Sequence, residues 1–366
     1  MRKKSEHALT AEEIALEIRR LPKMNGKPMF EILVHSILNF RSDFGYKLLC
    51  DYLTFSLGSA CAAACTYCYV ESIVAKHPEV KRLKRTLKRL GLKFQDVVIV
   101  RYDGLGILRE QLTIRKPPGL NLGIRRTIYT SPLVDPALNP VLARQTLKAC
   151  LILLELTAWD VRILSKGNFL RTIAEGLPDG FKQRVIFGHS TGLLDVTSRA
   201  VEGGTAILAK RLEDHWWLQD HGFRTFAMLC PILPSADINS DVRGMVEAVR
   251  IDRCEHAWAE VINVRGESMY RTCEALKNAG LHADAERLKA VSHKNCEAWE
   301  AYARSTFEAC TRYIPPDKLR FLQYPNAQTM EWWVDRRPQG AALLGKAAEM
   351  AGLTAAEPYW LALRNG

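Results

Sequence analysis

The chain has 366 residues, of which 48% are hydrophobic and 25% charged, and its formal net charge is +11. This balance is typical of a globular protein and excludes disordered and fibrous classes. No stretch approaches about 18 consecutive apolar residues, and the basic amino terminus lacks the apolar run of a signal peptide. We therefore expect a cytoplasmic protein without a membrane helix.

The first 49 residues are predicted to form a helical extension. Thr10 is suited to cap a helix whose first turn carries Glu12 and Glu13, where carboxylates interact favourably with the helix dipole. The apolar stretch at 29–40 is predicted to be a second, buried helix.

Strands and helices alternate from residue 50 to about 265. Six segments are predicted to be main strands: 52–58, 125–132, 160–167, 184–191, 223–234 and 258–264. This alternation indicates an α/β protein with a parallel sheet. Six units are too few for an eight-fold barrel, so we predict a partial (β/α)6 barrel, with a doubly wound open sheet as the alternative.

Two further segments stand outside this alternation. Residues 97–101 form an extra strand, which we interpret as an inserted hairpin together with 106–114. Residues 266–366 are predicted to form a helical C-terminal region. The predicted division is thus an extension at 1–49, a barrel at 50–265 and a helical region at 266–366.

A strongly basic segment follows the first strand. Seven of the thirteen residues from 81 to 93 are Lys or Arg, and Val80, Leu83, Leu87 and Leu90 recur at helical spacing. This pattern predicts an amphipathic helix with a basic outer face. Such a face is either a solvated surface or a contact for phosphates, which makes 80–93 the candidate contact for nucleic acid.

Three cysteines lie close together in the stretch GSACAAACTYCYV, where Cys61, Cys65 and Cys68 fall within eight residues. Structural zinc needs four ligands; His77 is the nearest candidate for the fourth, and the chain has no second C-x2-C pair. An iron–sulfur cluster matches better, because thiolates are its usual ligands and three of them leave one iron of a cubane free. Scattered cysteines are expected to be small buried hydrophobes: Cys50, Cys150, Cys230, Cys254, Cys273, Cys296 and Cys310.

The C-x3-C-x2-C spacing, with an aromatic residue before the last cysteine, resembles the radical S-adenosylmethionine superfamily. The segments RILSKG (162–167), HST (189–191) and 201–234 are similar to its spore photoproduct lyase and DNA-repair-photolyase-like branch. The resemblance covers about residues 50–265 and implies a partial radical-SAM-type barrel. It also implies a [4Fe-4S] cluster held by Cys61, Cys65 and Cys68, whose fourth iron binds S-adenosylmethionine.

The resemblance further implies roles for individual residues. Tyr67 would lie near the adenine, Lys166 would contact the methionyl carboxylate and Ser190 the ribose, while Glu202 and Arg211 would shape the pocket wall.

Two departures from the family pattern limit what can be carried over. The second strand ends in YTSPLVDP rather than in an acidic segment, so Ser131 and Asp135 are weak candidates for binding the methionyl amine. The lyase has a hydrogen-donating cysteine just before the Ser of the fourth strand, where this chain has Gly188 and His189. The resemblance therefore supports the chemistry more than the substrate.

The implied function is a lyase-like or other radical enzyme, in which a 5′-deoxyadenosyl radical abstracts hydrogen from a nucleic acid or nucleotide-like substrate. One alternative is the same chemistry on a small metabolite or peptide. Another is a zinc-stabilised nucleic-acid-binding module without catalysis. The implied cofactors are the cluster and S-adenosylmethionine, and the implied partner is a one-electron reductant such as flavodoxin or ferredoxin.

Overall fold

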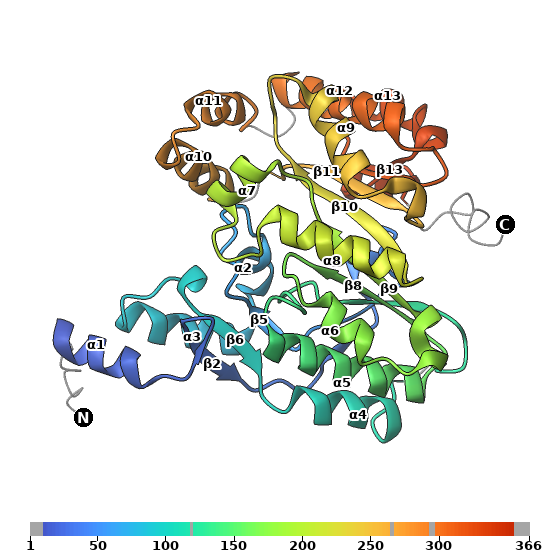
Figure 1. Cartoon of the computed structure of the whole chain (residues 1–366). Helices are drawn as coiled ribbons and strands as arrows, with labels where there is room; N and C mark the ends of the chain where they lie inside the picture. Colours follow the sequence, from blue (N-terminus) through green and yellow to red (C-terminus); the bar gives the residue numbers. More distant parts are fainter. Residues whose placement is uncertain (1–9, 118–119, 264–266, 293–296, 355–366) are drawn as a thin grey trace.

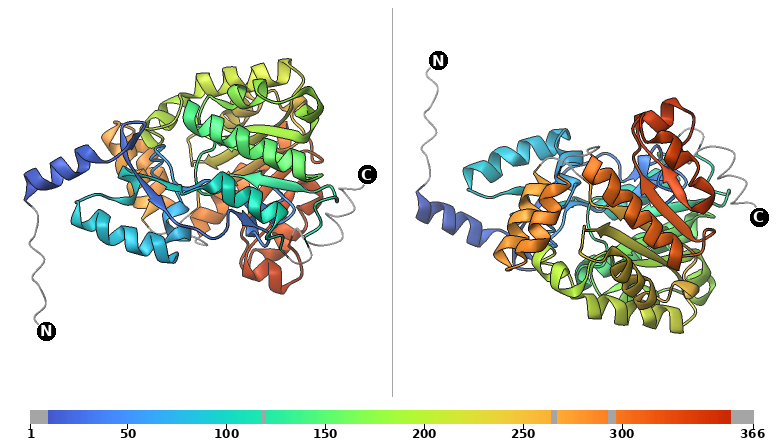
Figure 2. Two further views of the ribbon diagram at one scale, coloured as in Figure 1. Left: turned by 90° about the horizontal axis from the view of Figure 1, so that it is seen from below. Right: turned by 90° about the horizontal axis from the view of Figure 1, so that it is seen from above.

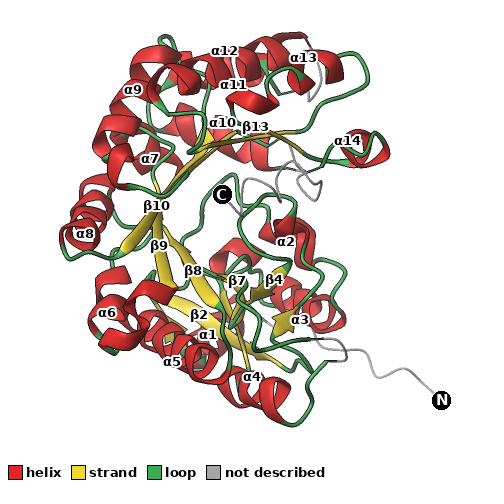
Figure 3. Ribbon diagram, turned by 90° about the vertical axis from the view of Figure 1, so that its right-hand side faces the viewer, coloured by secondary structure: helices red, strands yellow, loops and turns green. Residues whose placement is uncertain are grey.

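The main sheet is a curved, largely parallel sheet, shown from the side in Figure 3. The computed structural model describes residues 10–117, 120–263, 267–292 and 297–354. Within them the strand order is β13-β12-β11-β10-β9-β8-β7-β4-β3, and only β3 is antiparallel to its neighbour. The strands are β3 Leu38–Asn39, β4 Leu53–Phe55, β7 Thr127–Thr130, β8 Asp160–Ser165, β9 Val185–Ser190, β10 Arg224–Ile232, β11 Ala257–Val261, β12 Leu319–Gln323 and β13 Ala341–Leu343.

Helices follow the parallel strands, and several of them cover the outer face of the sheet (Figure 1). They are α4 Gly104–Thr113, α5 Pro140–Leu156, α6 Leu170–Glu175, α7 Asp195–Val201, α8 Leu208–Asp220, α9 Ile238–Ala248, α10 Ser268–Asn278, α11 His282–Ala290, α12 Glu297–Tyr313, α13 Met330–Val334 and α14 Lys346–Met350. Strands β4 and β7–β11 form the six predicted (β/α) units, which confirms the partial barrel.

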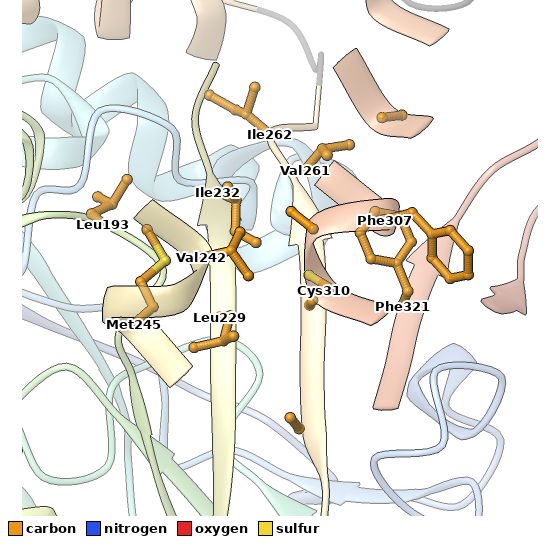
Figure 4. Close-up of a cluster of buried hydrophobic side chains, with 14 of the residues drawn as sticks. Leu193, Leu229, Ile232, Val242, Met245, Val261, Ile262, Phe307, Cys310 and Phe321 are labelled. Carbon is orange, nitrogen blue, oxygen red and sulfur yellow. The ribbon is translucent and has the colours of Figure 1, made fainter. Parts of the chain in front are cut away.

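The outer core lies between the sheet and these helices. Figure 4 shows side chains of β10, β11 and β12 packed against α9 and α12. Val242 and Met245 of α9 meet the β10 side, and Phe307 of α12 meets Phe321 of β12 with ring centroids 5.2 Å apart. Because both faces of these strands are covered, their sequences read as nearly continuous apolar runs.

The segment 42–52 packs against the concave face of the sheet, and we call it the plug. Arg162 on β8 donates hydrogen bonds to the carbonyl oxygens of Leu48 and Leu49, at 3.3 and 2.7 Å. Its guanidinium lies 4.8 Å from the ring centroid of Trp258, whose indole nitrogen donates to the Lys47 carbonyl at 2.7 Å. The polar side chains at the carboxyl ends of the strands lie above this plug.

The amino-terminal region differs from the prediction. The helix expected from Thr10 is present as α1 Ala11–Arg20, with Thr10 and Glu13 forming a capping box. The prediction of a buried helix at 29–40 is wrong, because these residues contribute to β2 Lys27–Ile32 and then to β3. A short apolar run suits either state, and pairing of β2 with β6 Val98–Arg101 selects the strand.

The insertion after the cysteines also differs from the prediction. Strand β6 exists, but the expected hairpin partner at 106–114 is helix α4, which Asp103 caps by accepting from the Gly106 amide at 3.3 Å. Strand β6 instead pairs with β2 and with β5 Gly58–Ala60 in a small sheet completed by β1 Lys23–Met24. The predicted strand 52–58 is thus divided between two sheets.

The carboxyl-terminal region was predicted to be helical throughout, and this prediction is wrong. Strands β12 and β13 extend the main sheet, and every residue of both is buried. They are short, and β12 pairs with β11, which precedes it by the three helices α10–α12, so no local periodicity marks them. In the described part of the chain, no helix has the length and apolar composition needed to cross a membrane.

Close backbone packing at the carboxyl end of β8 gives a test of this fold. A Cβ atom on Gly167 would collide with the Ala137 carbonyl, whereas Gly180 has no atom within 4 Å of such a position. We expect Gly167→Ala to lower the free energy of unfolding by about 2 kcal/mol or more, because backbone must move. Gly180→Ala, the matched control, should leave it unchanged or raise it by up to about 1 kcal/mol in urea denaturation. Equal stability of the two variants would contradict the packing.

Candidate active site

The three predicted cluster ligands lie in the loop between β5 and α2 Val70–Val74. Two backbone hydrogen bonds join this loop to the end of α7 and the turn after it: the Thr66 amide donates to the Val201 carbonyl, and the Gly204 amide donates to the Ala63 carbonyl, both at 3.0 Å. From α10, Arg271 Nε donates to the Thr66 carbonyl at 3.1 Å. The loop is therefore held from two sides.

Small residues allow this close fit. Ala62 and Ala63 are buried, and Ala64 takes a left-handed backbone conformation with φ of 50°. A Cβ atom on Gly204 would collide with the Ala62 carbonyl, so only glycine lets the two backbones approach as they do.

The three thiols influence one another electrostatically. Burial raises the pKa of Cys61 to about 11, with further contributions from Asp135 and Cys68. Burial also raises the pKa of Cys65, helped by the Glu202 charge and by Cys61 and Cys68. Thiolates in such surroundings need positive charge beside them, which a metal centre supplies.

The donor set fits a cluster held at three irons. Three cysteines and no competing ligand lie on the loop, and thiolate is the usual ligand of iron–sulfur clusters. Across the described ranges, no three His, Cys, Asp or Glu side chains are grouped so as to hold a metal ion. A cubane presents separate irons, so its ligands need not converge on one point. His77, the sequence candidate for a fourth zinc ligand, is the N-cap of the basic helix.

Beside the loop, Glu202 is the centre of a buried polar network. Its carboxylate accepts a hydrogen bond from the Tyr67 hydroxyl and one from Ser198 at 2.8 Å. It also pairs with Lys166 Nζ at 3.0 Å and with Arg211. Burial alone would raise the pKa of Glu202, but the two cations and the hydrogen bonds outweigh it and lower this pKa to about 2.

Ser190 joins this network at the end of β9. Lys166 Nζ donates to the Ser190 hydroxyl, which donates to the Cys230 carbonyl at 2.7 Å. Arg211 donates to the Ser190 carbonyl at 2.8 Å, and the Lys166 ammonium lies 5.4 Å from the centroid of the Tyr67 ring. The structure thus brings together Tyr67, Lys166, Ser190, Glu202 and Arg211, for all of which the family resemblance had implied a role.

The two weaker candidates lie at the edge of the network. Asp135 accepts from the Ser165 hydroxyl at 2.6 Å and from the Lys166 amide at 2.7 Å, so it shapes the turn that carries Lys166. Ser131 directly follows β7, and its buried hydroxyl has no hydrogen-bond partner among the described residues.

His189 faces away from the network, into the helical layer. Its Nε2 lies 3.1 Å from Asp214 on α8, and Asp214 also accepts from the backbone amides of Leu170 and Arg171. Its neighbour Ser190 faces the concave side, as the alternation of a strand requires. The contacts of His189 are those of a residue that stabilises the fold.

Three residues of this region were missed by sequence reasoning. Cys230 and Glu260 lie at the carboxyl ends of β10 and β11, with the thiol sulfur 3.5 Å from the carboxylate. Lys47 of the plug pairs with Glu260 at 3.0 Å. Cys230 was expected to be a buried hydrophobe; it is only partly buried, and its carbonyl accepts from Ser190 and Lys166. Its position at a strand end was the available signal.

The other scattered cysteines behave as predicted. Those that the structure describes are buried free thiols: Cys50, Cys150, Cys254, Cys273 and Cys310. Cys296 lies outside the described residues.

Comparisons with known proteins agree with the fold. No family model matches the sequence, and no curated protein matches it. A cysteine-to-serine mutant of spore photoproduct lyase is 12% identical, with a TM-score of 0.54, over 78% of this chain and 80% of that chain. Spore photoproduct lyase complexed with dinucleoside spore photoproduct has the same identity and coverage, with a TM-score of 0.52. The barrel that the sequence resemblance implied is therefore confirmed as a shared fold.

The network makes Glu202 a strong determinant of stability. Glu202→Gln should lower the free energy of unfolding by about 3 kcal/mol or more, because it leaves Lys166 and Arg211 without their buried counter-charge. The control Glu213→Gln removes an exposed ion pair with Lys210 and should cost less than about 1 kcal/mol. Urea denaturation compares the two, and similar losses would contradict the assigned role of Glu202.

Proposed function

We propose that the chain is a radical S-adenosylmethionine enzyme. In this proposal Cys61, Cys65 and Cys68 hold a [4Fe-4S] cluster, and the Glu202 network binds S-adenosylmethionine beside it. The observation that carries the proposal is the convergence of five side chains at the carboxyl ends of the strands: Tyr67 of the cysteine loop, Lys166 after β8, Ser190 of β9, Glu202 after α7 and Arg211 of α8. That end of a (β/α) barrel is where catalytic residues gather.

The cofactors supply the difficult chemistry, and the chain supplies binding and orientation. When bound, the cluster in its reduced state would supply one electron for cleavage of the S–C5′ bond of S-adenosylmethionine, which would give methionine and a 5′-deoxyadenosyl radical able to abstract a substrate hydrogen.

The network is suited to hold S-adenosylmethionine, a charged nucleoside derivative. Lys166 offers an ammonium group to a carboxylate, and Ser190 offers a hydroxyl to a ribose. Glu202 keeps Lys166 and Arg211 in place, because each cation is paired with it in a buried setting. The Tyr67 hydroxyl is fixed by Glu202, and the Lys166 ammonium lies over the Tyr67 ring. In the proposal, the adenine would bind beside this ring.

The proposed substrate is a nucleic acid or nucleotide-like molecule. A solved structure that shares the fold is named for its complex with dinucleoside spore photoproduct. We do not extend the proposal to photoproduct repair. Where the family pattern has a hydrogen-donating cysteine, this chain has Gly188 and His189, and His189 is engaged with Asp214.

The proposal is tested by assaying 5′-deoxyadenosine. Protein reconstituted with iron and sulfide without oxygen, then reduced with dithionite, should form it from S-adenosylmethionine. Alanine at Cys61, Cys65 or Cys68 should abolish formation, because each removes a cluster ligand. Lys166→Met should weaken S-adenosylmethionine binding about tenfold to 100-fold, through loss of a charge-assisted hydrogen bond.

Cys150→Ala is the matched control, since this buried thiol on α5 is remote from the loop in sequence and lies in the outer core. It should keep both the cluster and the activity. A colourless, zinc-loaded wild type without product would contradict the proposal and favour a zinc-stabilised binding module. Product formation that survives Cys65→Ala would contradict the ligand assignment.

A further inference from the structure

The outer face of α3 Pro78–Arg89 carries several basic side chains, and some of them form no ion pair with the described residues. Arg82, Lys84 and Arg89 pair with glutamates. Among the described residues Lys81, Arg85 and Lys88 have no ion-pair partner, and all three are exposed. They are spaced at i, i+4 and i+7, so they form one stripe along the helix.

A groove of about 400 Å³ continues this stripe towards α10. Lys84, Lys88, Lys93 and Arg271 border it, and Phe94 contributes to its apolar lining. Two glutamates also line the groove, so cations outnumber acidic side chains by four to two. Figures 1 and 2 place α3 and α10 on the same side of the molecule. We call the stripe and the groove together the basic face.

The basic face lies directly outside the cysteine loop. Arg271, which borders the groove, also donates to the Thr66 carbonyl within that loop. Glu71, three residues after Cys68, accepts from Lys84 at 3.1 Å and from Gln95 at 2.8 Å. Tyr67 of the same loop points the other way, to Glu202.

One packed layer of helices separates the loop from the basic stripe. Cys68 packs against an apolar cluster in which Val70 and Val74 of α2 meet Leu83 and Leu87 of α3. The basic stripe is on the opposite side of α3, and a helix with its side chains is roughly 10 Å across. The route from Cys68 to the surface thus crosses α2 side chains and one helix.

We propose that the basic face is the docking site for a small acidic one-electron carrier protein of the flavodoxin or ferredoxin type. The inference rests on the proposed function, in which the cluster must gain one electron from outside for each cleavage. The carrier is oxidised by one electron and the cluster is reduced by one, and no bond changes in this step. Opposite charges on the two surfaces would steer the encounter.

The placement favours a carrier over the nucleic acid predicted from the sequence of 80–93. A substrate must reach the side chains at the strand ends, such as Lys166 and Cys230, which lie on the inner side of the loop. An electron needs only to reach the cysteines, and the basic face lies on their outer side, across α2 side chains and α3. Both partners could then be bound at once.

The test compares two ways of reducing the cluster. The combined variant Lys81→Gln, Arg85→Gln and Lys88→Gln should form 5′-deoxyadenosine at the wild-type rate with dithionite. With flavodoxin, its reductase and NADPH, its rate at low salt should fall about tenfold or more, because charge steering is lost. The control variant Arg109→Gln, Arg144→Gln and Lys148→Gln neutralises three exposed cations on α4 and α5 and should match wild type in both assays.

A binding measurement needs neither the cluster nor activity. Isothermal titration calorimetry of flavodoxin with cluster-free protein should show an affinity that falls with added salt. The triple variant on α3 should lose this affinity, and the control variant on α4 and α5 should keep it. Unchanged flavodoxin affinity in the α3 variant would overturn the inference. So would loss of affinity for a labelled single-stranded oligonucleotide with flavodoxin binding intact, which would assign the face to nucleic acid. Absence of product from wild type with dithionite, by contrast, counts against the proposed function.

Discussion

A single buried carboxylate, Glu202, joins the parts of the candidate site. It pairs with Lys166 at the end of β8 and with Arg211 on α8, and it accepts from Tyr67 of the cysteine loop. Buried Arg211 and partly buried Lys166 would be costly without a counter-charge, so this residue stabilises the strand end, the helix and the loop together. Arg211 extends the arrangement to β9 through the Ser190 carbonyl.

The alternation of parallel strands decides which residues enter the site. Lys166, Ser190 and Cys230 lie at strand ends and face the concave side, where their groups contact one another. His189 is adjacent to Ser190, yet it faces the helices and pairs with Asp214. The plug that holds Lys47 against Glu260 closes the concave side below them. The concave face of the sheet thus carries the candidate site residues, and the outer face carries residues that stabilise the fold.

The parts of the fold and site that depend on local sequence patterns were predictable. The cysteine spacing, the basic amphipathic helix and the strand–helix alternation each occupy a short window. Elements that depend on distant partners were not predictable: β2 needed β6 to become a strand, and β12 and β13 needed the edge of the main sheet. The Lys47–Glu260 pair joins residues 213 apart in sequence, so no local sequence pattern could have predicted the contact.

Electron paramagnetic resonance of the reduced, reconstituted protein measures the cluster and its open iron together. A [4Fe-4S] cluster held by three cysteines should give a signal whose shape changes when S-adenosylmethionine is added. The change should require higher S-adenosylmethionine concentrations in the Lys166→Met variant, because the ammonium that binds the carboxylate is gone. A signal that S-adenosylmethionine leaves unaltered, or no cluster signal at all, would contradict the assignment of Cys61, Cys65 and Cys68.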